Sequence, residues 1–189
     1  SDAAEGSGEV VTVVLPAAPG TPRALRVAPA GTPAPDAPAL DESSWLWAEV
    51  QSGVARVQAA VVDAFVPQML NYESVDGINF RKGCYAGQEV VARSQFRGAI
   101  KRRGCIVRSA TKLSPGQELF DPQDLSQPCG LVAMAAAVPS GCGADGAWDA
   151  IASLQIATAQ GPAQGPALVT ADGAAVQTLP LPYPLRTDI

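Results

Sequence analysis

The apolar and polar positions of the first fifty residues predict two strands followed by a helix. Residues 9–15 (EVVTVVL) and 23–28 (RALRVA) read as strands, joined by the turn-forming stretch PAAPGTP. Residues 40–53 (LDESSWLWAEVQSG) place two acids at the start and a glycine at the end, which is the usual pattern of helix boundaries. The apolar face of this helix, expected to be core, comprises Leu46, Trp47 and Val50.

The remaining predicted elements are shorter. Residues 28–39 form a Pro/Ala loop, residues 54–58 (VARVQ) alternate as a short strand, and residues 60–66 (AVVDAFV) predict a short helix that Pro67 ends. Beyond Ile100 the chain carries short β-prone runs separated by Gly, Pro, Asp and Ser. These runs lie at about 104–108, 117–120, 129–138, 150–158, 166–170 and 174–179.

Repeated short strands with turn residues between them indicate a small antiparallel barrel or sandwich. The sequence therefore predicts an α+β protein with a boundary near residues 98–102. Residues 1–99 would form the α+β part, and residues 100–189 the β-domain.

Composition fits one large globular domain or two small ones, since 47% of the 189 residues are hydrophobic and 16% are charged. No stretch approaches 18 uninterrupted apolar residues, so no transmembrane helix is expected, and no secretory signal is visible. The sequence opens with Ser1 and enters an expected strand within ten residues. We therefore expect a fragment or a processed form.

Two features of composition narrow the chemistry. There is no histidine, which removes the commonest general base and metal ligand. The four cysteines form no CxxC pair, so neither a zinc site nor a self-contained iron–sulfur cluster is expected. Free thiols without a signal peptide predict a reducing, cytoplasmic location. Cys105, Cys129 and Cys142 lie in apolar or turn-like contexts and are expected to be small buried hydrophobes.

Charge is concentrated in one window of an otherwise acidic chain. The net charge is −5, but residues 81–108 hold eight basic residues against one acid, so this window carries +7 and the remainder −12. The basic residues are Arg81, Lys82, Arg93, Arg97, Lys101, Arg102, Arg103 and Arg108. Such a patch indicates one anionic partner at one place. A solvated face of a helix or strand is the alternative.

Within this window, one cysteine lies between two glycines. Gly83 and Gly87 bracket Cys84, and EVVARSQF after Gln88 predicts a helical turn or two. Lys82 and a helix N-terminus would both favour the thiolate of Cys84. The alternative to a reactive thiolate is a half-buried cysteine in a tight turn. From the residues alone, this second interpretation is favoured.

The rest of the window leaves further alternatives open. Glu89 could act as a base, accept a hydrogen bond from a ligand amide, or pair with Arg93 four residues on. Arg93, Arg97 and Lys101 would share one face if the helix continued through Gly98, and such a face binds carboxylates or phosphates. Aromatic stacking platforms are confined to Tyr85 and Phe96, so direct binding of RNA or DNA is not expected.

KGCYAGQE at 82–89 matches the pattern K-G-C-[FY]-x-G-Q-E of the folate-binding YgfZ family, which includes mitochondrial iron–sulfur assembly proteins. FVPQMLN at 65–71, the GINFRKG run and VARSQFRGAIKRR resemble the same family, so the resemblance covers about residues 65–103. It implies a fold similar to the T-protein of the glycine cleavage system, in which α+β domains and a C-terminal barrel surround a folate channel. The first domain of that fold would be missing here.

The resemblance also implies a function. Members of the family support assembly or repair of iron–sulfur clusters in client enzymes, including enzymes that modify tRNA. Carried onto this sequence, Cys84 would be the functional thiol, with no classical turnover and no metal held by this chain alone. The expected contacts to tetrahydrofolate or a derivative are Lys82, Tyr85, Gln88, Glu89, Arg93 and Arg97. The expected partners are folate and iron–sulfur client or assembly proteins.

Two alternative functions remain, a folate-dependent aminomethyl transferase and a tRNA-contacting module. T-proteins carry the pattern L-R-x-E-x-G, where this chain has AEVQSG at 48–53, with Glu49 in the place of the arginine. This departure favours the cluster-assembly branch over the transferase.

Overall fold

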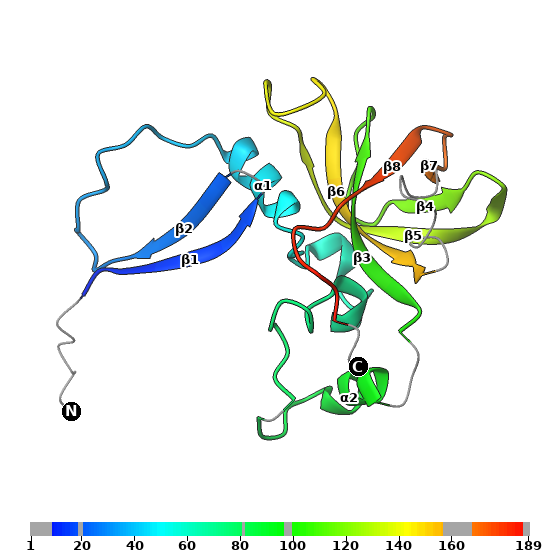
Figure 1. The fold of residues 1–189 in the computed structure, drawn as a ribbon, viewed down its shortest axis with the longest axis horizontal. Coiled ribbons are helices and arrows are strands. Elements are labelled where there is room, and N and C mark those ends of the chain that lie inside the picture. Colours follow the sequence, from blue (N-terminus) through cyan, green and yellow to red (C-terminus); the bar gives the residue numbers. More distant parts are fainter. Residues whose placement is uncertain (1–8, 19–20, 81, 97–99, 157–167, 187–189) are drawn as a thin grey trace.

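The C-terminal half of the chain closes into a six-stranded antiparallel barrel (Figure 1). The computed structural model describes residues 9–18, 21–80, 82–96, 100–156 and 168–186. The barrel strands are β3 (Arg102–Ser109), β4 (Glu118–Asp121), β5 (Asp124–Ala137), β6 (Trp148–Gln155), β7 (Leu168–Thr170) and β8 (Ala175–Leu179). Their order around the barrel is β3-β6-β5-β4-β7-β8, and β8 closes onto β3. The sequence-based prediction of a small antiparallel barrel is confirmed.

The barrel interior is filled by inward-facing aliphatic side chains. Val107, Leu119, Val132, Leu154 and Leu168 are all fully buried and belong to one cluster. Closure removes the free sheet edges that an open sheet would expose.

A second apolar cluster joins the outside of the barrel to the preceding segment. Ile106, Met134 and Ile151 of the barrel pack with Val50 and Ala55 from the first half of the chain. The two halves therefore share a core. The division at residues 98–102 stays a prediction, because residues 97–99 lie outside the described part.

Helix α1 (Glu42–Gln51) forms as expected, with Asp41 as its N-cap. The Asp41 carboxylate accepts a hydrogen bond from the backbone N–H of Ser44 at 3.4 Å, so one of the unpaired amides of the first turn is satisfied. The expected apolar face is confirmed, since Val50 is fully buried and Leu46 and Trp47 pack against the same cluster.

Asp149 of β6 ties α1 to the barrel. This fully buried carboxylate accepts hydrogen bonds from Trp47 Nε1 at 2.8 Å and Gln51 Nε2 at 2.6 Å. Arg108 donates to the same carboxylate through Nε at 2.6 Å and Nη2 at 2.7 Å. A buried charge is stable only when paired and hydrogen-bonded, and Asp149 meets both conditions.

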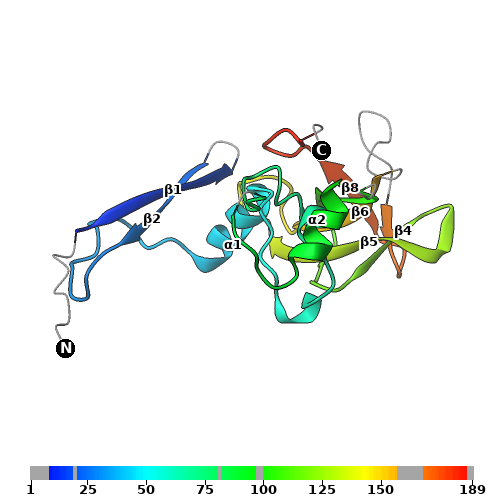
Figure 2. The ribbon, with the colours of Figure 1, turned by 90° about the horizontal axis from the view of Figure 1, so that it is seen from below.

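The two expected N-terminal strands pair as an antiparallel hairpin, β1 (Val11–Ala18) with β2 (Thr21–Val27). The hairpin projects away from the barrel, with α1 between them (Figures 1 and 2). Register places Val11 opposite Val27 and Val13 opposite Leu25. These four side chains form an apolar stripe, and each of them is 45% to 54% exposed.

One buried arginine anchors the hairpin to α1. Arg23 is 7% exposed and forms an ion pair with Glu49 of α1. Its Nε and Nη2 also donate to the carbonyl of Pro16, at 3.2 and 2.8 Å, and its guanidinium lies 5.2 Å from the ring centroid of Trp45. Glu49 additionally pairs with Arg56 at 3.0 Å.

Two short elements differ from the prediction. Residues 54–58 are not a strand, because alternation alone does not supply a partner and the closed barrel offers no free edge. The helix expected at 60–66 is reduced to a 3₁₀ turn, η1 (Ala59–Val61). Pro67 begins the next turn, η2 (Pro67–Leu70), instead of ending a helix, since proline without an N–H suits the first helical position.

The η2 turn is held to β3 by Asn71. This buried residue adopts a left-handed backbone with φ of 61°. Its amide exchanges two hydrogen bonds with Gly104, donating to the carbonyl at 2.7 Å and accepting from the N–H at 3.0 Å. A Cβ at position 104 would lie 3.0 Å from Asn71 Nδ2, so glycine permits this close approach.

Candidate functional site

The predicted helix after the KGCYAGQE motif is present as α2 (Gln88–Phe96), so Cys84 lies four residues before its first residue. Gly87, with φ of +81°, turns the chain into the helix, and its carbonyl accepts from Val90 N–H at 3.1 Å. Gln88 has a local role, since its Oε1 accepts from the Tyr85 N–H at 3.3 Å. Gln88 therefore orders the loop, whereas the sequence predicted it as a folate contact. That contact stays a prediction.

The motif loop is open to solvent. Lys82, Gly83, Cys84, Ala86 and Gly87 are all exposed. A Cβ built at Gly83 or at Gly87 would meet nothing within 4 Å. The two glycines thus leave room for a ligand or a partner protein to approach the backbone of the loop.

Lys82 and Tyr85 meet at the rim of an apolar pocket. Lys82 Nζ lies 4.5 Å from the centroid of the Tyr85 ring, within the range of a cation–π contact. We call the hollow beneath them the motif pocket; it has a volume of about 370 Å³. It is lined by Val57, Phe65, Val66, Pro67, Leu70, Tyr72, Gly77, Ile78, Asn79, Lys82, Tyr85 and Val91.

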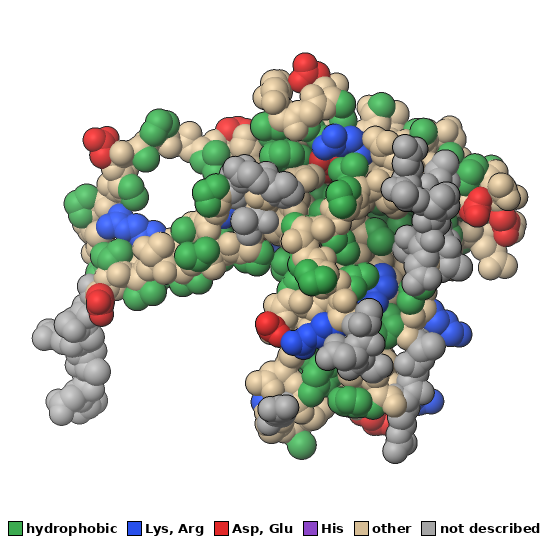
Figure 3. Space-filling model, in the orientation of Figure 1, with side chains coloured by type: hydrophobic (Ala, Val, Ile, Leu, Met, Phe, Trp, Pro, Cys, Tyr) green, Lys and Arg blue, Asp and Glu red, His purple; other side chains and the backbone are tan. Residues whose placement is uncertain are grey.

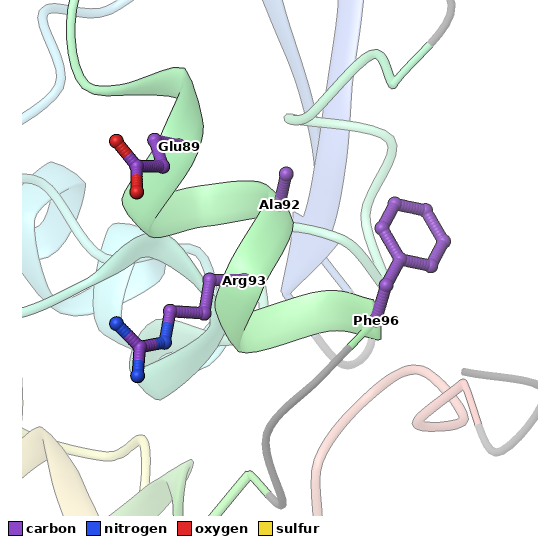
Figure 4. Close-up of a pocket in the computed structure, with 4 residues that line it drawn as sticks. All are labelled: Glu89, Ala92, Arg93 and Phe96. Carbon is purple, nitrogen blue, oxygen red and sulfur yellow. The ribbon is translucent and has the colours of Figure 1, made fainter.

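Glu89 and Arg93 point to one side of α2, whereas Ala92 and Phe96 point to the other (Figure 4). These four residues line a larger hollow of about 680 Å³, which we call the open hollow on α2. No ion pair joins Glu89 to Arg93 among the ion pairs of the described residues. The i,i+4 pair is therefore absent here, and both side chains are exposed.

The proposed cationic face of Arg93, Arg97 and Lys101 is only partly described. Helix α2 is described as far as Phe96, and Arg97 lies outside the described residues. Lys101 lies just before β3 and is not helical. The structure nevertheless brings Arg93 and Lys101 together, because both line a hollow of about 270 Å³.

Fewer basic side chains of residues 81–108 are available to a ligand than the net charge of this window indicates. Arg103 forms an ion pair with the buried Glu73, and Arg108 pairs with Asp149. Arg102 donates to the carbonyl of Cys129 at 3.3 Å. Three of the eight basic residues thus serve the fold. On the face shown in Figure 3, Lys and Arg side chains gather over the lower lobe, where Figure 1 places α2.

The cysteines differ in exposure. Cys84 and Cys142 are exposed, Cys105 is half-buried and Cys129 is buried. The prediction that Cys142 is buried is wrong, because it lies in the glycine-rich tip between β5 and β6 and not in a strand. Burial raises the pKa of the Cys105 thiol to about 11.

Several residues that shape the site were not singled out from the sequence. Gln68 is fully buried, and its Nε2 donates to the Val91 carbonyl of α2 at 2.8 Å. Tyr72 lines the motif pocket, and its hydroxyl donates to the carbonyl of Ala55. A polar residue inside the otherwise apolar run FVPQML was the available signal for Gln68.

The described residues contain no group of three or more His, Cys, Asp or Glu side chains that could hold a metal ion. In the same part of the chain, no helix has the length and apolar character needed to cross a membrane.

Comparison with known proteins gives a partial match. No family model matches the chain. A "tRNA-modifying protein YgfZ" from Serratia proteamaculans is 48% identical over 62 residues, or 33% of this chain and 19% of the relative. The protein of the same name from Edwardsiella ictaluri is 39% identical over 75 residues, covering 40% of this chain and 23% of the relative. The one from Sodalis glossinidius is 47% identical over 62 residues, covering 33% and 19%.

Part of this chain is homologous to YgfZ. The chain matches only about a fifth of the length of these YgfZ relatives. Among solved structures, the glycine cleavage system aminomethyltransferase T from Bartonella henselae is similar over 62% of this chain and 28% of its own. Its sequence identity is 19% and the TM-score is 0.39.

Proposed function

We propose that this chain is the folate-binding and barrel portion of an accessory protein that supports iron–sulfur cluster assembly or repair. Through its client enzymes, this protein would support tRNA modification in a reducing cytoplasm. The homology to proteins named "tRNA-modifying protein YgfZ" supports the link to tRNA. The folate and iron–sulfur roles rest on the KGCYAGQE motif and on the site around it.

The observation that carries the proposal is the motif pocket beside the Lys82–Tyr85 contact. Its volume of about 370 Å³ lies within the range of small-molecule sites, about 300–1,000 Å³. Aromatic and aliphatic side chains form most of its lining, and they suit the flat ring of a pterin. Lys82 places one positive charge beside this lining, over the Tyr85 ring.

Four residues of the expected folate set line either this pocket or the open hollow on α2. Lys82 and Tyr85 line the motif pocket, while Glu89 and Arg93 line the open hollow on α2. We assign ring binding to Lys82 and Tyr85. Arg93 would attract the carboxylates of the ligand, and Glu89 would accept a hydrogen bond from a ligand N–H.

Cys84 is the proposed functional thiol. It is exposed on the loop that carries Lys82 and Tyr85, and open space adjoins both flanking glycines. This geometry lets a partner reach the sulfur directly. Because the chain has no histidine, a Cys–His pair within it is excluded, and we propose that Cys84 acts with a client or assembly protein.

Cys142 provides a matched control, because it is the other exposed cysteine among the described residues. Cells that lack their own copy would be supplied with the wild-type protein, Cys84→Ala or Cys142→Ala. Modified nucleosides made by cluster-dependent tRNA-modifying enzymes would then be quantified by mass spectrometry. We expect Cys84→Ala to lose most of the modification and Cys142→Ala to keep it. Equal modification in the two variants would rule out the proposed thiol role.

A further inference from the structure

The last described residues, 180–186, run from the end of β8 toward the side of the molecule that carries α2 (Figure 1). We call them the C-terminal strap. Leu181 packs against the apolar cluster that joins the barrel to α1. The hydroxyl of Tyr183 donates to the carbonyl of Gly53 at 2.7 Å and accepts from Asn71 Nδ2 at 3.3 Å. The middle of the strap is therefore fixed by apolar packing and two hydrogen bonds.

The end of the strap completes a ring of hydrogen bonds around Glu73, which is 1% exposed. The backbone N–H of Arg186 donates to Ser74 Oγ at 3.1 Å, and Ser74 Oγ donates to Glu73 Oε1 at 2.9 Å. Glu73 forms an ion pair with Arg103 of β3, and Arg103 Nη2 donates to the carbonyl of Arg186 at 3.3 Å. A buried carboxylate needs such partners, so the strap helps to stabilise this buried charge.

The side chain of Arg186 makes one further contact, an ion pair with Asp76 at 3.2 Å. The two side chains are 49% and 86% exposed, and exposed ion pairs are weak and are screened by salt. The strap thus has a firmly packed middle at Tyr183 and a weakly held end at Arg186. The end is able to detach while the middle stays in place.

One segment of the chain, residues 71–79, lies between the strap and the motif pocket; we call it the wall loop. Ser74 and Asp76 of this loop contact the strap. The N–H of Gly77 donates to the carbonyl of Tyr72 at 2.7 Å, which closes the loop tightly. The wall-loop residues that line the motif pocket are Tyr72, Gly77, Ile78 and Asn79. Movement of Ser74 and Asp76 would therefore also move the pocket lining.

The backbone of the wall loop is strained at two places, and the strap contacts both. Asn71 and Asp76 have left-handed backbones, with φ of 61° and 57°. This conformation is unfavourable for residues other than glycine, and Asn and Asp tolerate it best. Tyr183 contacts Asn71, and Arg186 contacts Asp76. Strained residues persist where surrounding contacts hold them, so loss of the Arg186 contact favours relaxation of the loop.

We propose that the C-terminal strap positions the wall loop, and that release of its end at Arg186 opens the motif pocket. Tyr183 is the fixed point, whereas the contact between Arg186 and Asp76 is the one that breaks. Both members of this pair are positioning residues, because they act on a ligand only through the wall loop. Salt, or an anion that competes for Arg186, would favour the open form. This inference holds whichever molecule occupies the pocket.

Amide hydrogen exchange of the full chain without ligand tests the strap. Asp76→Asn removes the charge and keeps a residue that tolerates the left-handed backbone. We expect the wall loop to exchange about threefold faster in this variant at low salt, since an exposed ion pair is lost. In the wild-type protein, raising NaCl from about 50 mM to about 1 M should give a similar acceleration by screening the pair. Salt should have no further effect on Asp76→Asn, and β5 and β6 should not change.

Asp63→Asn is the matched control. Asp63 is exposed and also left-handed, with φ of 61°. It belongs to none of the ion pairs of the described residues. The wall loop of this variant should exchange and respond to salt as in the wild-type protein. Equal acceleration of the wall loop in both variants, or a wall loop that neither Asp76→Asn nor salt alters, would overturn the strap.

A second readout, which rests on the proposed function, tests the opening of the pocket. Stopped-flow binding of 5-formyltetrahydrofolate would give the association and dissociation rate constants. Easier opening should raise both by about threefold in Asp76→Asn and leave Kd nearly unchanged, whereas loss of a ligand contact acts mainly on dissociation. Faster exchange of the wall loop with unchanged rate constants, or with faster dissociation alone, would overturn the opening. No binding of this folate would contradict the proposed function, and the exchange result would still decide for or against the strap.

Discussion

Asp149 determines how α1 is held on the barrel. Four hydrogen bonds reach its carboxylate from Trp47, Gln51 and Arg108. The same carboxylate raises the pKa of Arg108, mainly through their hydrogen bonds. Arg108 therefore stays charged across the ordinary pH range.

Replacing Asp149 with asparagine keeps the shape and removes the charge. The Arg108 guanidinium would lose its anionic partner, which typically destabilises a protein by about 3–5 kcal/mol when the pair is buried. Arg108 is 20% exposed, so we expect about 3 kcal/mol, measured as the change in the free energy of unfolding in urea. Asp145→Asn at an exposed loop position is the control and should change it by less than about 0.5 kcal/mol. Equal effects in the two variants would contradict the role of Asp149.

The cysteines should separate in reactivity. At pH 8 we expect iodoacetamide to modify Cys84 and Cys142, which are exposed, while Cys105 and Cys129 react only on unfolding. Burial raises the pKa of the Cys105 thiol in the folded protein from the ordinary value of 9.0 to about 11. Between pH 9 and about pH 11 the unfolded chain therefore loses this proton while the folded chain keeps it, so the free energy of unfolding falls as the pH rises. Mass spectrometry of the labelled peptides would check the pattern; rapid labelling of Cys105 at pH 8 would contradict it.

At the scale of elements, Arg23 makes the main polar attachment of the hairpin β1–β2 among the described residues. An isolated two-stranded hairpin is marginal in water, and this one exposes an apolar stripe and both edges. Arg23 supplies its attachment through the ion pair with Glu49 and the hydrogen bonds to Pro16. The hairpin is therefore expected to open locally before the barrel does.

Arg23→Leu should detach the hairpin without unfolding the barrel. Limited digestion with thermolysin, which cleaves beside exposed aliphatic residues, should cut within 11–27 about tenfold faster, corresponding to about 1.4 kcal/mol of lost local stability. Arg26→Leu in the same strand removes only an exposed hydrogen bond to Pro33 and should leave the cleavage rate nearly unchanged. A barrel fragment that is also digested in Arg23→Leu would show that the anchor stabilises the whole molecule.

The sequence predicted where most helices and strands lie. It did not predict which elements contact one another in the fold. The six barrel strands and both helices follow from local alternation, turns and capping residues such as Asp41. The strand expected at 54–58 failed because strand formation depends on a neighbouring edge, which no local pattern reveals. The hydrogen bonds between Asp149 and α1 join residues that are 98 and 102 positions apart in the sequence. No local sequence pattern predicts contacts over such a separation.

The candidate site shows the same division. The motif located Lys82, Cys84 and Tyr85, and the structure brings Lys82 and Tyr85 together at one pocket. The charge of the window predicted more free cations than exist, because Arg103 and Arg108 neutralise buried acids. Only the fold could show which basic side chains have internal partners.

At the scale of the whole molecule, the described residues form a closed barrel with the candidate site on one side of it and the hairpin β1–β2 beyond α1. Helix α1 and η2 pack on the barrel, and α2 packs on η2 through Gln68. The motif loop precedes α2, the outermost of these packed elements, and is exposed to solvent. Binding at the loop would therefore leave the barrel core unchanged and alter only the outer layer.

The central claim is that a folate binds in the motif pocket. The most direct test is amide hydrogen exchange of the protein with and without 5-formyltetrahydrofolate, resolved by peptide. We expect slower exchange in peptides covering 65–72 and 82–91 on binding, and no change in the hairpin or in β4 and β5. Binding without protection of these two segments, or no binding at ligand concentrations up to about 1 mM, a standard free energy near −4 kcal/mol, would contradict the claim.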